Sequence, residues 1–81
     1  MTQTETQLPR ESPMNDETFN LSIRKFLKTV GVKSQHEIEQ AVAAALAART
    51  ITDGASLPAV MTLKIPELGL DVEFPGKIEL G

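Results

Sequence analysis

Few residues of this 81-residue sequence could take part in chemistry, and none of them forms a recognisable catalytic set. His36 is the only histidine, and the chain has no cysteine that could join it in a metal site or act as a nucleophile. Asp71 and Glu73 alternate with apolar residues, which is typical of the solvent-facing side of a strand, although paired carboxylates can also bind a cation. We therefore predict no catalytic, cofactor-binding or metal-binding residues, and a protein that is not an enzyme.

The charge distribution disfavours nucleic-acid binding. The formal net charge is −3, whereas binding to phosphates requires a basic excess. Residues 15–33 carry a basic excess through Arg24, Lys25, Lys28 and Lys33, and residues 51–81 carry an acidic excess. Three phenylalanines are the only aromatic residues, so a stacking surface for single strands is not expected.

Residues 15–31 predict an amphipathic helix. Asn15 or Asp16 suits its N-cap, and Gly31 suits the left-handed position that follows a helix. The apolar stripe of this helix consists of Phe19, Ile23, Phe26, Leu27 and Val30, which recur with a helical period.

Residues 34–49 predict a second helix. Ser34 and Glu37 have the spacing of a capping box, in which each side chain satisfies a backbone amide at the helix start. The predicted apolar stripe consists of Ile38, Ala41, Val42, Ala45 and Leu46, and further alanines leave much of the remaining surface small. These small side chains would allow close approach of another protein, although alanine is also the best helix former.

The period of the apolar residues changes to two after Pro58, which predicts a β-hairpin. One face consists of Ala59, Met61, Leu63 and Ile65 in the first strand and of Leu70, Val72 and Phe74 in the second, with Ile78 and Leu80 continuing the pattern. Residues 66–69 predict the turn, with Gly69 at a positive φ. Pro75 and Gly76 predict a bulge or kink, and Thr50–Thr52 could add a very short extra strand.

These elements predict an α+β domain of order α-α-β-β, in which a two-helix pair packs on a C-terminal antiparallel β-hairpin. Such packing would bury both helix stripes and the hairpin face together. Residues 1–13 are polar and predict a disordered N-terminal tail, so that the domain covers residues 14–81. Met14 is then a candidate alternative start.

A helix pair followed by a hairpin also resembles a helix-turn-helix with a wing, which is the main alternative. The second helix would then be the recognition helix. Its first turns carry Glu37 and Glu39 and no basic residue, which is unfavourable beside DNA phosphates.

From Met14 onward, the chain resembles a family of short bacterial proteins of unknown function. The resemblance rests on segments 14–20, 22–28 and 30–32, on Ser34-Gln35 and Glu37-Ile38-Glu39, and on Leu57-Pro58-Ala59, Met61-Thr62-Leu63 and Leu68-Gly69-Leu70. It covers the whole predicted domain and implies no activity.

Together, these features predict a non-enzymatic protein-interaction module of the bacterial cytoplasm, with homodimerisation as one form of that function. The alternative is a small nucleic-acid-binding protein with a helix-turn-helix-like pair and a hairpin wing. We expect a protein partner or self-association, no cofactor, and no membrane association, because no apolar run reaches the roughly 20 residues that a membrane span needs.

Overall fold

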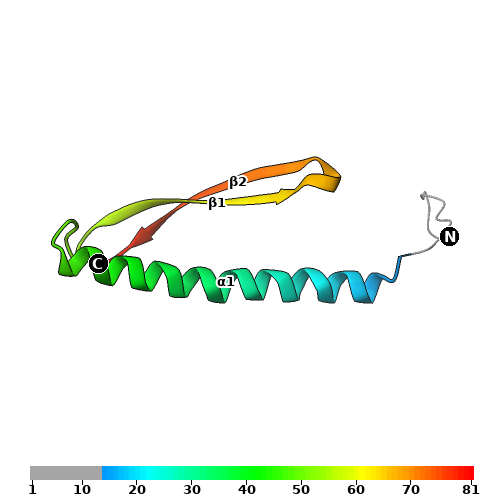
Figure 1. Cartoon of the computed structure of the whole chain (residues 1–81), viewed down its shortest axis with the longest axis horizontal. Helices are drawn as coiled ribbons and strands as arrows, with labels where there is room; N and C mark the ends of the chain where they lie inside the picture. The colour runs from blue at the N-terminus through cyan, green and yellow to red at the C-terminus, as the bar shows by residue number, and fades with distance from the viewer. Residues whose placement is uncertain (1–13) are drawn as a thin grey trace. The chain divides into compact units, whose positions relative to one another are not determined.

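The computed structural model describes residues 14–81, which form one long helix followed by an antiparallel β-hairpin (Figure 1). The elements are helix α1 (Asp16–Ala47), strand β1 (Ser56–Ile65), the short 3-10 helix η1 (Pro66–Leu68) and strand β2 (Leu70–Glu79). The order is therefore α-β-β. The α+β class is correct, but the predicted α-α-β-β order with a two-helix pair is wrong. The predicted tail, residues 1–13, lies outside the described residues.

Helix α1 continues through the segment in which we predicted a turn. Gly31 and Ser34 both lie inside the 32-residue helix, so Gly31 ends no helix and Ser34 begins none. A break here would leave up to four amides and four carbonyls without helical partners. Keeping one glycine inside a helix costs only about 1 kcal/mol. Because no proline interrupts the segment, the continuous helix is the less costly solution.

Both ends of α1 have defined caps. At the N-terminus, the Thr18 amide donates to Asn15 Oδ1 at 3.0 Å, which confirms Asn15 as the N-cap. At the C-terminus, the Thr50 amide donates to the Ala45 carbonyl and the Arg49 amide donates to the Leu46 carbonyl. Arg49 has φ 61°, so these two bonds form a Schellman motif with arginine at the left-handed position.

The Thr50–Thr52 segment does not form the short extra strand that the sequence allowed. Thr50 belongs to the helix cap, where its hydroxyl also donates to the Ala45 carbonyl at 3.2 Å. Because the cap holds this segment against the helix end, the chain turns here and first becomes extended at Ser56.

The chain divides into two compact units, Met1–Glu39 and Gln40–Gly81, and α1 passes through the boundary between them. In the first unit, the described structure is Met14, Asn15 and the larger part of α1. The second unit contains the last turns of α1, the connecting loop and the hairpin. The prediction of a single domain over residues 14–81 stays a prediction.

The two strands pair without interruption over ten residues each, from Ser56 opposite Glu79 to Ile65 opposite Leu70. Pro75 and Gly76 face Val60 and Ala59 in this register, so the predicted bulge is absent.

The hydrogen-bond pattern explains how the strands accommodate proline. The Leu80 amide donates to the Ala55 carbonyl at 2.9 Å, just beyond the last paired strand residues. Hydrogen-bonded and non-hydrogen-bonded pairs alternate along an antiparallel ladder. Pro58 and Pro75 both fall in non-hydrogen-bonded pairs, where the backbone nitrogen points away from the partner strand. Neither proline therefore removes a hydrogen bond from the hairpin.

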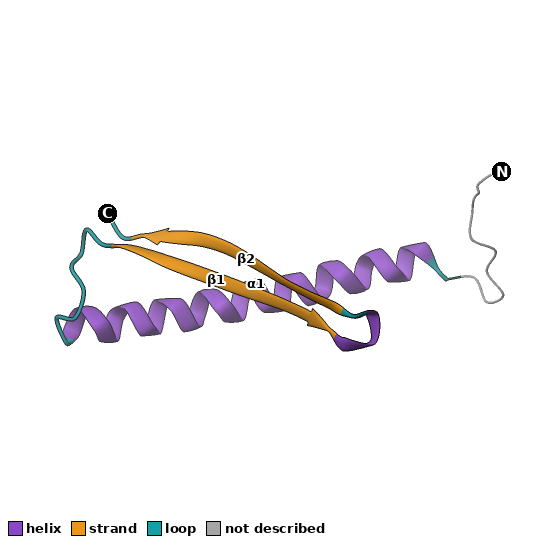
Figure 2. Cartoon of the chain, turned by 90° about the horizontal axis from the view of Figure 1, so that it is seen from above, coloured by secondary structure: helices purple, strands orange, loops and turns teal. Residues whose placement is uncertain are grey.

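The turn between the strands is formed as predicted, by the short helix η1 and Gly69 (Figure 2). Pro66 begins η1, and Gly69 has φ 64°. The Gly69 amide donates to the Pro66 carbonyl at 3.0 Å and closes the turn.

None of the described residues is buried, although many are apolar. The least exposed positions are only half-buried, for example Val42 in α1 and Leu57, Leu63 and Ile78 in the hairpin. A two-stranded hairpin is marginal in water on its own, and a helix gains most of its stability from packing. The described part of the chain also holds no helix with the length and apolar character of a membrane span.

Candidate interaction surfaces

The hairpin has one continuous apolar face, as the alternating sequence predicted. It comprises Leu57, Ala59, Met61, Leu63 and Ile65 of β1 and Leu70, Val72, Phe74, Gly76 and Ile78 of β2, which stand opposite one another in the register. Phe74 is 52% exposed and its partner Met61 is 44% exposed. An exposed apolar surface of this kind is typical of an interaction site. We call these residues the apolar hairpin face.

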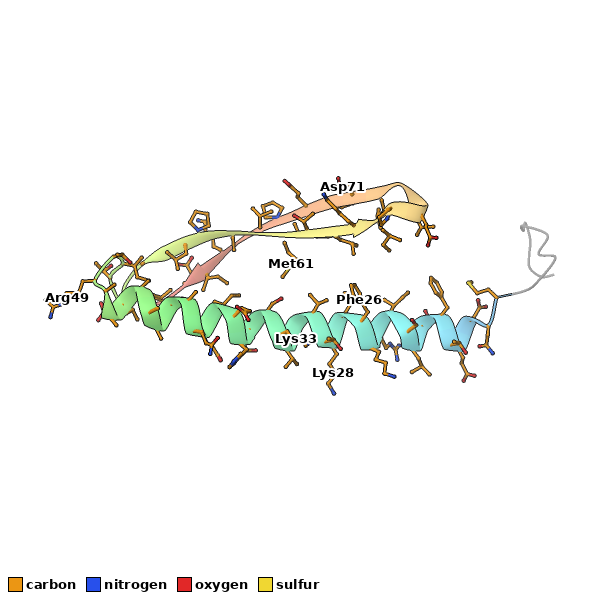
Figure 3. All side chains as sticks on the ribbon, viewed as in Figure 1. Phe26, Lys28, Lys33, Arg49, Met61 and Asp71 are labelled. Atoms are coloured by element: carbon orange, nitrogen blue, oxygen red, sulfur yellow. The ribbon has the colours of Figure 1, made fainter. Side chains whose placement is uncertain are left out.

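The opposite face of the hairpin is polar and carries charges of both signs. Figure 3 shows Met61 and Asp71 projecting from opposite faces of the hairpin. Asp71 lies opposite Lys64, and Glu73 lies opposite Thr62. Val60 is the exception, because it is a β-branched apolar residue on the polar face and is 61% exposed.

The first unit presents a second apolar surface, on one side of α1. Phe19 and Phe26 are 48% and 54% exposed, and Ile23 lies between them on the same side. Figure 3 shows Phe26 and Lys28 projecting from opposite sides of the helix. The predicted stripe of residues 19–30 is thus present, but it is exposed.

Arg24 and Lys25 lie near Lys28 on one side of α1, whereas Lys33 lies about 140° further round the helix, since each residue turns it by about 100°. One shallow, open depression is lined by Leu21, Arg24, Lys25 and Lys28, and another by Lys28, Thr29, Val32 and Lys33. Each depression lies between side chains of a single helix, so it encloses no ligand. The helix-turn-helix that motivated the nucleic-acid alternative is wrong, because α1 contains no turn between residues 31 and 34.

His36, Asp71 and Glu73 do not form a common site. His36 lies within α1 and is exposed, so it does not belong to the first turn of the predicted second helix over residues 34–49. Asp71 and Glu73 share the exposed polar face of β2, as predicted. Within residues 14–81, no group of three or more histidine or acidic side chains is arranged to hold a metal ion.

The sequence shows prolines in both strands, but only the register shows which outer edge of the hairpin each of them occupies. On the outer edge of β2, Pro75 interrupts the backbone amides at the centre of the strand. On β1, Pro58 lies near the strand start. The backbone N–H groups of Val60, Thr62 and Lys64, which point away from β2 and are called outward amides below, are therefore all present. The number of residues between each proline and the turn decides whether its nitrogen points toward the partner strand or toward the outer edge. That number can be interpreted only when the strand register is known.

Comparison with known proteins gives a family model, described as a family of unknown function (DUF6494), which matches residues 14–81. The match begins at Met14, the residue where the sequence resemblance also began. No curated protein and no solved structure matches the chain.

Proposed function

The chain belongs to the DUF6494 family, whose function is unknown, and we propose that it is a non-enzymatic protein-interaction module that binds a protein through the apolar hairpin face. The observation that carries this proposal is that none of the described residues is buried. An apolar face of ten residues, none of which is buried, lacks the full packing that normally stabilises a sheet. A protein partner that covers this face would supply that packing.

The chemistry of the two hairpin faces supports binding through one of them. The apolar hairpin face carries no charged residue, whereas the other face carries Lys64, Asp71, Glu73, Lys77 and Glu79. Charged residues are depleted in the centres of protein interfaces and large apolar residues such as Phe74 and Met61 are enriched. The polar face is therefore the solvent-facing side in the proposed complex.

Site-specific photo-crosslinking tests this proposal in cells that produce the chain. A photoreactive phenylalanine analogue at Phe74 is compared with the same analogue at Glu73, the neighbouring residue on the opposite face. We expect a discrete protein adduct from position 74 and none from position 73. Equal labelling at both positions, or no protein adduct at position 74, would refute the proposal.

The mass of the adduct identifies the kind of partner. An adduct of twice the chain mass indicates a second copy, and any other discrete mass indicates a different protein. Both results support the interaction module, and they separate it from the more specific inference below.

A further inference from the structure

We infer that two copies of this chain pair along the outer edges of their β1 strands, antiparallel and with Thr62 on the two-fold axis, to form a four-stranded sheet of order β2-β1-β1-β2. This inference goes beyond the proposed function, because the second copy binds at the β1 edge and extends the apolar hairpin face instead of covering it. A single hairpin has two outer edges, and an open edge offers unpaired backbone groups to another strand. The distribution of prolines decides which edge is open.

The outer edge of β2 is protected. Its outward amides belong to the residues of the polar face, and Pro75 removes the central one. Asp71, Glu73, Lys77 and Glu79 add charged side chains along the same edge. Proline and charge are the features by which natural strands avoid edge-to-edge pairing.

The outer edge of β1 is open over its second half. The outward amides of Val60, Thr62 and Lys64 follow one another without a proline, and only Lys64 is charged. Apart from the two prolines, Val60 is the only apolar residue on the polar face of the hairpin, and it is 61% exposed. A neighbouring strand along this edge would cover Val60, which explains an apolar residue on the polar face.

The positions of the outward amides also select the register. With Thr62 on the axis, Thr62 faces Thr62 of the second copy and Val60 faces Lys64 of the second copy. All three outward amides of each copy are then used, and no like charges face each other. Moving the axis to Val60 places Thr62 opposite Pro58 of the second copy, which has no amide to donate. Moving it to Lys64 places two lysines opposite each other, which is unfavourable.

The same register joins the apolar hairpin faces of the two copies. Met61 comes to lie opposite Leu63 of the second copy, and the small Ala59 opposite the larger Ile65. The apolar surface then widens from about 10 Å for two strands to about 20 Å for four, since neighbouring strands lie about 4.8 Å apart. A surface of that width matches two helices of about 10 Å each, whereas a single hairpin is only one helix wide.

Proline scanning tests the inference without breaking the hairpin. The Thr62 amide points away from β2, so T62P removes the central edge donor and keeps the ladder of the hairpin, as the native Pro58 and Pro75 do. The matched control is E73P, because Glu73 lies directly opposite Thr62 and its amide points to the other edge. Both variants therefore introduce the same ring at the same level of the hairpin.

Light scattering over a hundredfold concentration range measures the outcome on the full chain. We expect the wild type and E73P to reach twice the 8.8 kDa mass of one chain, and T62P to stay at the mass of one chain. A wild type that stays monomeric throughout, a dimeric T62P or a monomeric E73P overturns the inference. A monomeric wild type leaves the proposed function standing if Phe74 still forms adducts with a different protein.

If T62P does not fold, a cysteine variant tests whether Thr62 of one copy faces Thr62 of the second copy. The chain contains no cysteine, so T62C and E73C each introduce a single thiol. Residues facing each other in a hydrogen-bonded antiparallel pair have Cα atoms about 5.5 Å apart, which is within disulfide range. We expect T62C to form a covalent dimer on mild oxidation and E73C to form none at the same concentration. Equal crosslinking of the two variants, or none by T62C, overturns the inference.

Discussion

Replacing Gly31 with alanine tests whether α1 is continuous. Gly31 lies inside the helix, and a Cβ atom added to it meets no atom within 4 Å. The substitution therefore introduces no clash and removes the conformational freedom that glycine has in the unfolded chain. Glycine inside a helix is about 1 kcal/mol less favourable than alanine, so G31A is expected to raise the free energy of unfolding by about that amount.

In a two-helix structure, G31A would lower the free energy of unfolding instead of raising it. If Gly31 occupied the left-handed position after a first helix, alanine there would cost about 1–2 kcal/mol. Gly69 supplies a matched control, because a Cβ atom added to it also meets nothing within 4 Å, but its φ is 64°. G69A is therefore expected to be destabilising by about 1 kcal/mol, for the conformational reason alone.

Urea unfolding followed by far-ultraviolet circular dichroism measures both variants. With a slope of about 1–3 kcal/mol per molar urea, a change of about 1 kcal/mol shifts the midpoint by roughly 0.3–1 M. We expect the midpoint to rise for G31A and to fall for G69A. A fall for G31A of the size seen for G69A would refute the continuous helix.

Two further substitutions test the caps of α1. R49G places glycine at the left-handed position of the Schellman motif, where Arg49 has φ 61°, and is expected to raise the free energy of unfolding by about 1 kcal/mol. An unchanged or lower urea midpoint for R49G would contradict the motif. N15A removes the oxygen that accepts from the Thr18 amide and is expected to lower the helix stability by about 1 kcal/mol. Faster hydrogen exchange of the first-turn amides checks N15A, whereas N15D should retain the wild-type rates.

Local signals in the sequence were sufficient for the hairpin and for the start of the helix. The alternation around Met61 and Phe74 identified the apolar hairpin face, because side chains of a strand point to opposite sides in turn. Gly69 was correctly predicted at a positive φ, since the four-residue turn needs that conformation. Asn15 was among the predicted N-caps because a short side-chain oxygen can reach an amide of the first turn.

The break at Gly31 was predicted from signals that are also compatible with a continuous helix. On one straight helix, the two apolar stripes lie about a quarter turn apart, at 100° per residue, and this change of direction resembled two helices packed separately. Glycine and serine are permitted within a helix at modest cost, so a glycine followed by a capping box does not by itself end one.

The sequence by itself therefore determined what depends on neighbouring residues: the hairpin, its turn, its apolar face and the N-cap of α1. The tertiary structure decided what depends on longer-range geometry. It decided that residues 31–34 continue the helix, because the hydrogen bonds of that helix outweigh the cost of one glycine. It also decided which backbone amides of β1 and β2 point outward, because that direction follows from the strand register and cannot be read from either strand alone.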